Sequence, residues 1–599
     1  MPDTEPAHPA DPHLLQDLLR PLQGQPGALY LRSHPATAPD QSLRLARGTV
    51  LSTDTAFGAF YFAWWHSVAG LTRVTLAVRL SGRAEVRIQQ DAGRGVTLVL
   101  AAEVDGDGTT VTLVPQLEPP GTNGANRLFV EVKALTTCRV LALDWCTDQP
   151  PVRQTTLSIG LCTFNQEAYL TRTLTGLTAL ADRLPALLRI HVVNQGAPFT
   201  SAALQALCQH PKIRLTQQRN LGGCGGFTRS MVQEVAQAAP ASHHLLMDDD
   251  IILDERMIQR ALRFLDFAQE DVAIGAAMFD ALRPTVVHEA GAWLGKANRI
   301  EPYCHEVDLG DPRQLWHFNA RVRTDYNAWW FCIVPTKMVR KVGLPAPVFI
   351  RGDDFEYGQR LSEAGCATVT LPGLGVWHEP FYAKPTSWQD YYDLRNRLIF
   401  GATHPEKVSQ LSLAHVVGLI ASAALTHNYP SARLRLKAVQ DYLAGPEQVF
   451  ADPEAVHASV MAAAKPDAPE RLGPEWSRRP AAPPGPKRPA QMAALVGHMA
   501  LALLWTGFWP FRGRETVVMD VDATPLNIAG RPFVQTNGMR SYHLRFVPSK
   551  RVLWPLIRQT FHIARRYRRE RAKVDAGWLA AIPKYRTPEW WQAIFPLDG

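Results

Sequence analysis

Residues 157–164 read Leu-Ser-Ile-Gly-Leu-Cys-Thr-Phe, an apolar run of the length expected for a buried strand. An amphipathic helical pattern follows at 167–184, and a second apolar run, Ile-His-Val-Val-Asn, occupies 190–194. Strands that alternate with helices build a mostly parallel sheet covered on both faces. Ligands of such sheets bind beyond the carboxyl ends of the strands. The strand ends are therefore where we expect functional residues.

The chain on the N-terminal side of this region has a different pattern. Residues 43–148 contain short period-two runs separated by turn signals, which predict an antiparallel β-sandwich or barrel, the sandwich being the first choice. The runs lie at 74–78, 84–88, 96–100 and 110–114. Aromatic side chains at Trp64 and Trp65 suit either core packing or a sugar platform, and core packing is the favoured interpretation.

The chain beyond about residue 401 carries long helical patterns, at 408–428 and 432–443. Residues 465–489 are dense in Pro and Arg, which is typical of a semi-rigid linker. The fold class is therefore predicted as α/β, with a β-sandwich domain at 1–150, an α/β domain at 151–400 and a helical region at 401–599.

Composition and charge set the broad class. The 599 residues are 46% hydrophobic and 20% charged, which describes a globular, multidomain chain. A net charge of +8 suits an anionic partner, which could be a nucleic acid, a membrane surface or a phosphorylated ligand. Basic residues concentrate at 565–573, which predicts a surface patch; the alternative is a solvated helix face.

Cysteine usage and leader signals bear on the compartment. The eight cysteines form no C-x-x-C pair, so neither a zinc ribbon nor a disulfide framework is indicated, and a reducing cytoplasm fits best. The N-terminus has no basic start followed by an apolar run, as a secretory signal would. The apolar stretch 492–509 is interrupted by Gly497, His498 and Gly507. It is interpreted as a buried or interfacial helix rather than a membrane span.

Three adjacent acids, Asp248, Asp249 and Asp250, follow the apolar run 243–247. Carboxylates at adjacent positions repel one another unless a cation or hydrogen-bond donors neutralise them, so they indicate a divalent metal site. The alternative is an acidic turn that caps the following helix.

A second pair of acids, Asp353 and Asp354, leads into a helical pattern at 356–364. A carboxylate in the first turn of a helix is ionised more readily, and it can act as a base near neutral pH. The alternative is a plain helix cap. Farther along, His378 ends the apolar element 371–378, and an imidazole with two carboxylates is a reasonable ligand set for Mn²⁺ or a similar ion.

Two further segments suit a sugar nucleotide and its acceptor. Residues 219–229, Arg-Asn-Leu-Gly-Gly-Cys-Gly-Gly-Phe-Thr-Arg, place glycines before a helix, where backbone can approach a nucleotide. This segment lacks the Gly-Lys-Ser/Thr sequence of a P-loop. Tyr326, Trp329 and Trp330 offer apolar faces for a sugar, although adjacent tryptophans are as often core.

Together these residues resemble family 2 glycosyltransferases of the GT-A fold, and more closely the bacterial galactofuranosyltransferases that extend cell-wall galactan. The resemblance rests on residues 163–165, the three acids at 248–250, the acids at 353–354 and the dipeptide 377–378. It also includes the segments NLGGCGGF, DYNAWW, DLRNR and YLAGPE.

The resemblance implies a GT-A nucleotide-sugar domain and a role for each motif. Asp248, Asp250 and His378 would hold Mn²⁺ or Mg²⁺, Asp354 would be the general base, and Asp353 would assist it. Tyr326, Trp329 and Trp330 would lie near the acceptor. The residues expected near the donor are Phe164, Asn165, Gln166, Asn194, Arg219, Gly222, Gly223, Gly225, Gly226 and Asp249.

The resemblance also implies partners and a location. We expect a UDP-linked sugar donor, a carbohydrate or lipid-linked glycan acceptor, an anionic membrane surface and a homo-oligomer, but no nucleic acid. The expected place is the cytoplasm, peripheral at the inner face of the cell membrane. The expected reaction is inverting transfer of a hexose, galactofuranose being the first choice, onto a growing cell-envelope glycan.

The chain departs from the family at three positions, and three alternative functions are open. Gln166 stands in place of an Arg, Asn194 in place of an Asp, and Gly352 in place of a Trp before the paired acids. The alternatives are a rhamnosyl- or other hexosyltransferase, a hydrolase or phosphatase that uses the acidic clusters, and a non-catalytic carbohydrate-binding protein on a transferase fold.

Overall fold

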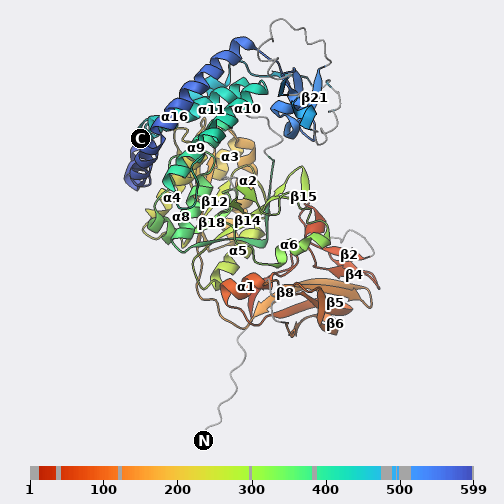
Figure 1. Cartoon of the computed structure of the whole chain (residues 1–599). Coiled ribbons are helices and arrows are strands. Elements are labelled where there is room, and N and C mark those ends of the chain that lie inside the picture. Colours follow the sequence, from red (N-terminus) through yellow and green to blue (C-terminus); the bar gives the residue numbers. More distant parts are fainter. Residues whose placement is uncertain are drawn as a thin grey trace.

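The structure is a computed structural model of the chain, drawn in Figure 1. It describes residues 12–34, 42–118, 124–295, 300–380, 387–473, 476, 480, 489–493, 496–497 and 515–595. The N-terminal strands, the central α/β region and the C-terminal helices follow one another along the molecule (Figure 1).

The N-terminal region is one antiparallel sheet of eight strands, in the order β1-β8-β5-β7-β4-β2, with β3 paired to β8 and β6 paired to β5. Its strands are β1 (His13–Gln16), β2 (Arg32–His34), β3 (Arg44–Leu45), β4 (Val50–Ser52), β5 (Thr75–Asp91), β6 (Val96–Leu113), β7 (Arg127–Ala134) and β8 (Cys138–Thr147).

The runs at 74–78, 84–88, 96–100 and 110–114 were predicted as separate strands, and this is wrong: the first two belong to β5, which begins at Thr75, and the last two belong to β6, which ends at Leu113. Gly82, with a positive φ of 90°, lets the strand continue where a turn was expected. The first half of β5 pairs with β8 and the second half with β7, so the sheet curls around its own core. Trp64 and Trp65, on α1 (Phe62–Ala69), are buried in that core, which confirms the packing interpretation.

The central region is a mixed sheet of nine strands in the order β11-β10-β9-β12-β18-β14-β19-β13, with β15 paired to β14. The four strands β9 to β12 are parallel, and β18 runs antiparallel to β12 and β14. The strands are β9 (Leu157–Thr163), β10 (Leu187–Asn194), β11 (Ile213–Gln217), β12 (His243–Asp248), β13 (Ile252–Leu253), β14 (Val272–Asp280), β15 (Arg283–Glu289), β18 (Cys332–Pro335) and β19 (Ala367–His378).

Helices pack on this sheet through apolar stripes. Leu170, Leu174 and Leu177 of α2 are fully buried, and their spacing puts them on one face of the helix. The predicted α/β fold class is therefore confirmed. The remaining elements of this region are α3 (Ala202–Cys208), α4 (Gly222–Val235), α5 (Arg256–Phe267), β16 (Ala292–Leu294), β17 (Ile300–Pro302), α6 (Trp316–Asn319), α7 (Thr336–Val342) and α8 (Asp353–Glu363), with α2 spanning Glu167–Arg183.

The C-terminal region is helical, as predicted, and long helix α16 lies along α9, α10 and α11 (Figure 1). It also contains a four-stranded sheet that the sequence patterns did not indicate. The helices are α9 (Gln389–Thr403), α10 (Leu413–Leu425), α11 (Tyr429–Ala444), α12 (Pro446–Phe450), α13 (Pro453–Ala464), α15 (Pro525–Ile528), α16 (Lys550–Tyr585) and α17 (Pro588–Ile594), and the strands are β20 (Glu470–Arg471), β21 (Thr516–Met519), β22 (Phe533–Thr536) and β23 (His543–Phe546).

Two predictions concern segments that lie largely outside the described residues. The linker at 465–489 is described only in part, and its first residues include β20. Most of the apolar stretch 492–509 is outside the description. Every helix that the structure does describe is too short or too polar to cross a bilayer.

Candidate active site

Asp248, Asp250 and His378 meet at the ends of two strands. One ligand atom from each residue lies within 4.8 Å of the others, and His378 Nε2 is 3.1 Å from Asp250 Oδ1. Ligands on one first-row divalent ion are about 2.0 to 2.2 Å from it, so atoms at this spacing can share a single ion. Two carboxylates and an imidazole therefore fit Mn²⁺ or a similar cation.

The sheet explains how these distant residues come together. Asp248 is the last residue of β12, and His378 is the last residue of β19. The short strand β13 follows the three acids and pairs with the end of β19, with Ile252 opposite Trp377. This two-residue ladder holds the acidic turn against His378.

Burial and mutual repulsion dominate the electrostatics of the acidic turn. Burial and the neighbouring Asp250 raise the pKa of Asp248 to about 7, and burial raises the pKa of Asp249 to about 7. Burial lowers the pKa of His378, but its hydrogen bond to Asp250 and the negative charges of Asp250 and Asp248 together outweigh this, so the pKa is raised overall. A bound divalent cation would favour the ionised form of these carboxylates and so lower their pKa values.

The acids Asp353 and Asp354 open helix α8, as the sequence predicted. Gly352, rather than either acid, is the N-cap residue, and its φ of 84° explains why glycine occupies the position. Asp354 Oδ1 accepts a hydrogen bond from the backbone N–H of Phe355 at 2.7 Å. Burial raises the pKa of Asp354 to about 6, and burial and Asp354 raise the pKa of Asp353 well above its ordinary range.

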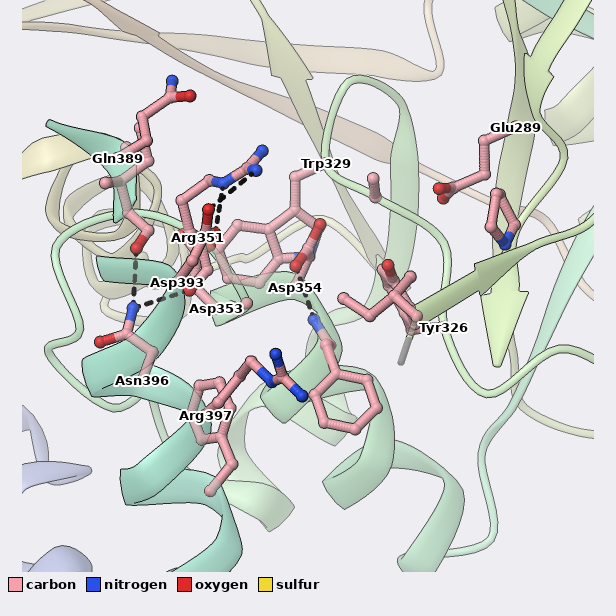
Figure 2. Close-up of a pocket in the computed structure, with 18 of the residues that line it drawn as sticks. Glu289, Tyr326, Trp329, Arg351, Asp353, Asp354, Gln389, Asp393, Asn396 and Arg397 are labelled. Atoms are coloured by element: carbon pink, nitrogen blue, oxygen red, sulfur yellow. Dashed lines mark hydrogen bonds and ion pairs between the residues drawn. The ribbon is translucent and has the colours of Figure 1, made fainter. Parts of the chain in front are cut away.

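A cavity of about 720 Å³ joins the two acidic clusters, because Asp248, Asp353 and Asp354 all line it. Figure 2 shows Asp353, Asp354 and Trp329 between side chains of α9 on one side and Glu289 with Tyr326 on the other. A cavity of this volume is in the range that accommodates a small-molecule ligand.

Tyr326, Trp329 and Trp330, which were predicted near the acceptor, all line this cavity. Each is at least nine-tenths buried, so each also packs in the core. Trp329 contacts Phe227 and Tyr357 edge-to-face, which fixes the plane of its ring.

The sequence predictions missed several residues of the cavity wall. Glu289 ends β15 and is buried, and its Oε1 has no hydrogen-bond partner among the described residues. Burial, followed by repulsion from Asp354, raises the pKa of Glu289 to about 8. No strand was predicted at 283–289, and β15 runs antiparallel to β14, so the rule for parallel strand ends did not point to this residue. The other missed polar residues of the wall are His288, Arg351, Gln389, Asp390, Asp393, Asn396, Arg397 and Arg435.

The residues predicted near the donor are only partly on this cavity. Of that set, Gly223 is the member that lines it among the described residues. Phe164 is about half exposed and follows β9. Asn165 Oδ1 accepts from the Ala197 N–H at 2.9 Å, so this side chain joins the ends of β9 and β10. Gln166 precedes α2, and Asp249 follows β12.

Three of the predicted donor-binding glycines have a packing reason for lacking a side chain. A Cβ on Gly226 would lie 2.2 Å from Cys162 Sγ, and one on Gly225 would lie 2.2 Å from Leu221 Cβ. A Cβ on Gly222 would lie 2.1 Å from the carbonyl oxygen of Phe349. These glycines bring α4 close to β9 and to the segment before Asp353.

Asn194 and Arg219 make contacts within the protein. Asn194 Nδ2 donates to Gln217 Oε1 at 2.9 Å and to the Ala197 carbonyl at 2.7 Å, so it fastens the turn after β10. Arg219 forms ion pairs with Asp452 and Glu454 at the start of α13. A donor-binding role for either residue stays a prediction.

Comparison with known proteins identifies the group to which the chain belongs. Residues 154–401 match the family described as glycosyltransferase like family 2. Over 490 residues the chain is 31% identical to the galactofuranosyltransferase GlfT2 of Mycolicibacterium smegmatis, and the match covers 76% of this chain and 73% of that protein. The chain belongs to glycosyltransferase family 2.

A second relative of this family 2 glycosyltransferase is the galactofuranosyltransferase GlfT2 of Mycobacterium tuberculosis. It is 30% identical over 480 residues, which cover 73% of each chain. Among solved structures, the chain is similar to a mannosyltransferase from Pyrobaculum calidifontis in complex with GDP-mannose and Mn²⁺. That similarity has 11% identity and a TM-score of 0.31, and it covers 53% of this chain and 87% of the other.

Proposed function

We propose that this family 2 glycosyltransferase is a metal-dependent, inverting hexosyltransferase that adds galactofuranose from UDP-galactofuranose to a growing, lipid-linked cell-envelope glycan. The proposal rests on one cavity, which is lined by Asp248 of the proposed metal cluster and also by Asp353 and Asp354. The two GlfT2 relatives support the choice of sugar.

Asp354 is the proposed general base. An acceptor hydroxyl attacks C1 of the donor sugar and passes its proton to the Asp354 carboxylate. The bond between C1 and the diphosphate oxygen breaks at the same time, and its electrons go to the leaving group. Attack on the face opposite the leaving group inverts the configuration at C1. A pKa of about 6 leaves Asp354 ionised at neutral pH while keeping it basic enough to take the proton.

Asp248, Asp250 and His378 are the proposed ligands of Mn²⁺ or Mg²⁺. When bound, such an ion stabilises the negative charge that develops on the leaving nucleoside diphosphate. The three side chains hold the site at the ends of β12 and β19, beside the cavity. Their ligand atoms are already grouped, so the protein needs little rearrangement to bind the ion.

The acceptor is proposed to enter along the aromatic residues Tyr326, Trp329 and Trp330. Aromatic faces stack on the C–H groups of a sugar ring, and Tyr and Trp also offer a polar edge. Glu289 and the polar side chains of α9 are within the same cavity and supply hydrogen-bonding groups for sugar hydroxyls.

A lipid-linked acceptor requires a docking surface near the bilayer, and α16 offers one. Trp554 and Phe561 are 46% and 71% exposed, which is unusual for large aromatic side chains. Exposed Arg551, Arg558 and Arg565 are spaced so that they share this helix face. Aromatic side chains among arginines suit an anionic membrane surface, which here would be the cytoplasmic leaflet.

The test is a donor screen with purified full-length protein and Mn²⁺. The donors are UDP-galactofuranose, UDP-galactopyranose and dTDP-rhamnose, each with a synthetic lipid-linked galactofuranosyl disaccharide. We expect elongation with UDP-galactofuranose and, by NMR, a C1 configuration opposite to that of the donor. Preferential use of dTDP-rhamnose would overturn the sugar assignment. Transfer to water alone would indicate a hydrolase, and tight acceptor binding without turnover would indicate a carbohydrate-binding protein.

A further inference from the structure

The backbone just before the catalytic acids is strained. Phe349, Arg351 and Gly352 all have positive φ values, of 73°, 72° and 84°. Residues other than glycine rarely adopt this conformation because Cβ crowds the backbone. Two non-glycine residues within three positions persist in it only where the surrounding structure holds them. The next residues in the chain are Asp353 and Asp354.

Helix α9 holds this strained turn through its buried side chains. Asn396 Nδ2 donates to the carbonyls of Ile350 at 2.8 Å and Arg351 at 2.7 Å. Arg395 Nη2 donates to the carbonyl of Val348 at 2.6 Å. Figure 2 shows Asn396 beside Arg351 at the edge of the cavity.

Asn396 is itself fixed, so it transmits the rigidity of α9 to the turn. Its side chain is 1% exposed, and its Oδ1 accepts from Arg395 Nε at 2.9 Å. The Arg395 guanidinium in turn lies over the rings of Tyr391 and Tyr392, at 5.1 and 4.9 Å from their centroids.

The opposite side of the turn is held by the glycine-rich segment. The backbone N–H of Cys224 donates to the Phe349 carbonyl at 3.0 Å, and Gly222 packs against the same carbonyl. The turn is therefore clamped between α4 and α9. Without the Asn396 hydrogen bonds, α9 would hold the turn through Arg395 at Val348 and through the Arg351–Asp393 ion pair, in which Nε and Oδ1 are 2.9 Å apart. The Ile350 and Arg351 carbonyls would lose their Asn396 donor, so the backbone could relax and Asp354 would move with it.

We infer that Asn396 is a positioning residue that holds the strained turn and thereby aims Asp354 at the acceptor hydroxyl. This inference rests on the proposed function, because it assumes that Asp354 is the base. Asn396 acts through its hydrogen bonds to the backbone carbonyls of Ile350 and Arg351, and it transfers no proton itself.

The first experiment compares Asn396→Ala and Asn396→Ser with the wild type. Alanine removes the hydrogen bonds that Asn396 Nδ2 donates to the carbonyls of Val348, Ile350 and Arg351, whereas serine keeps one hydroxyl donor. We expect single-turnover rates to fall roughly 10- to 100-fold for alanine, because a displacement of about 1 Å can cost 100-fold, and less for serine. Donor affinity, measured by calorimetry, should change less than about twofold. If alanine does not fold, serine alone decides: a wild-type rate overturns the inference, and a reduced rate with unchanged donor affinity supports it.

The matched control is Asn537→Ala. Asn537 is also 1% exposed, and it holds a turn in the small C-terminal sheet by donating to Ser541 Oγ at 2.6 Å. We expect this variant to lose thermal stability without a lower transfer rate. Equal losses of rate in the two variants would mean that Asn396 acts only through general stability, and would overturn the inference.

A second experiment tests the strain directly. Arg351→Gly removes the Cβ penalty of the left-handed conformation but also the ion pair with Asp393, so Asp393→Ala, which loses the same ion pair and keeps the arginine backbone, is its control. We expect the rate loss caused by Asn396→Ala to shrink at least threefold in the Arg351→Gly background and not in the Asp393→Ala background. An undiminished loss would overturn the role of strain.

Asp354→Asn, assayed in the same experiment, distinguishes a wrong assignment of the base from a wrong role for Asn396. If Asp354→Asn transfers at the wild-type rate, the proposed base is wrong. If Asp354→Asn is inactive while Asn396→Ala transfers normally, the base stands and only the positioning role of Asn396 fails.

Discussion

His378 Nε2 lies 3.1 Å from Asp250 Oδ1, although His378 ends β19 and Asp250 follows β12, which is far away in the sequence. The pairing of β13 with β19 enforces this contact. Two carboxylates grouped with one imidazole are a ligand set that suits a divalent cation such as Mn²⁺.

Metal removal should abolish transfer. We expect excess chelator to stop the reaction and added Mn²⁺ to restore it, and we expect Asp250→Ala and His378→Ala each to lower the rate at least about 100-fold. Mn²⁺ binding, followed by electron paramagnetic resonance, should weaken in the same variants. The control is His305→Ala, because His305 is half exposed and outside the cluster. Full wild-type activity in excess chelator would contradict the metal assignment.

The transfer rate should have an acid limb near pH 6. Burial raises the pKa of Asp354 from an ordinary 3.8 to about 6, and the base must be ionised to accept a proton. The rate should therefore be nearly constant above pH 7 and fall about tenfold per pH unit well below pH 6. Single-turnover measurements from pH 5 to 8 at saturating Mn²⁺ and donor would test this. A rate that stays constant down to pH 5 would show that Asp354 ionises normally or is not the base.

Glu289 should be a neutral hydrogen-bond donor at pH 7. Its pKa of about 8 means that the protonated carboxyl predominates there, and its Oε1 faces the cavity without a partner among the described residues. Glu289→Gln keeps an uncharged donor and should retain most activity, whereas Glu289→Ala should raise the acceptor KM several-fold. Steady-state kinetics with varied acceptor would measure both. Equal losses in the two variants would indicate that the carboxylate form is required.

Membrane binding should depend on the exposed face of α16. We expect the protein to float with vesicles that contain anionic lipid. Each basic residue near the lipid surface contributes about 1 kcal/mol of electrostatic attraction. Salt screens this attraction, so binding should weaken as the salt concentration rises. Trp554→Ala with Phe561→Ala should reduce binding at all salt concentrations, because the apolar contribution is not screened. Leu579→Ala, an exposed position farther along the same helix, is the control. Absence of flotation at low salt would leave this face as a solvated surface or an oligomer contact.

The sequence predicted those parts of the site that lie at strand ends. Asp248 and His378 could be found because parallel strands end at the same edge of a sheet, and Asp354 because an acid opens a helical pattern. The continuous strand β5 was not predictable, since Gly82 looks like a turn residue until its pairing with Gly106 of β6 is known.

Residues that act through tertiary contacts could not be predicted from local patterns. Asn396 lies in a segment that carried part of the family resemblance, but its hydrogen bonds reach back to Ile350 and Arg351. The glycines 222, 225 and 226 suggested a nucleotide loop, and the structure adds a packing reason for each. Gly352 also has a packing reason for lacking a side chain, because a Cβ at that position would lie 2.7 Å from Phe400 Cε2.

The most direct measurement of the central claim is single-turnover transfer by Asp354→Asn, with donor binding measured by calorimetry on the same protein. Asparagine keeps the size of the side chain and its hydrogen bond to the Phe355 N–H but cannot accept the proton. We expect donor and metal affinity to persist while the chemical step falls roughly 10²- to 10⁴-fold. Asp353→Asn is the control, and its loss should be milder. A near wild-type rate for Asp354→Asn with an inactive Asp353→Asn would assign the base to Asp353, and two active variants would contradict the mechanism.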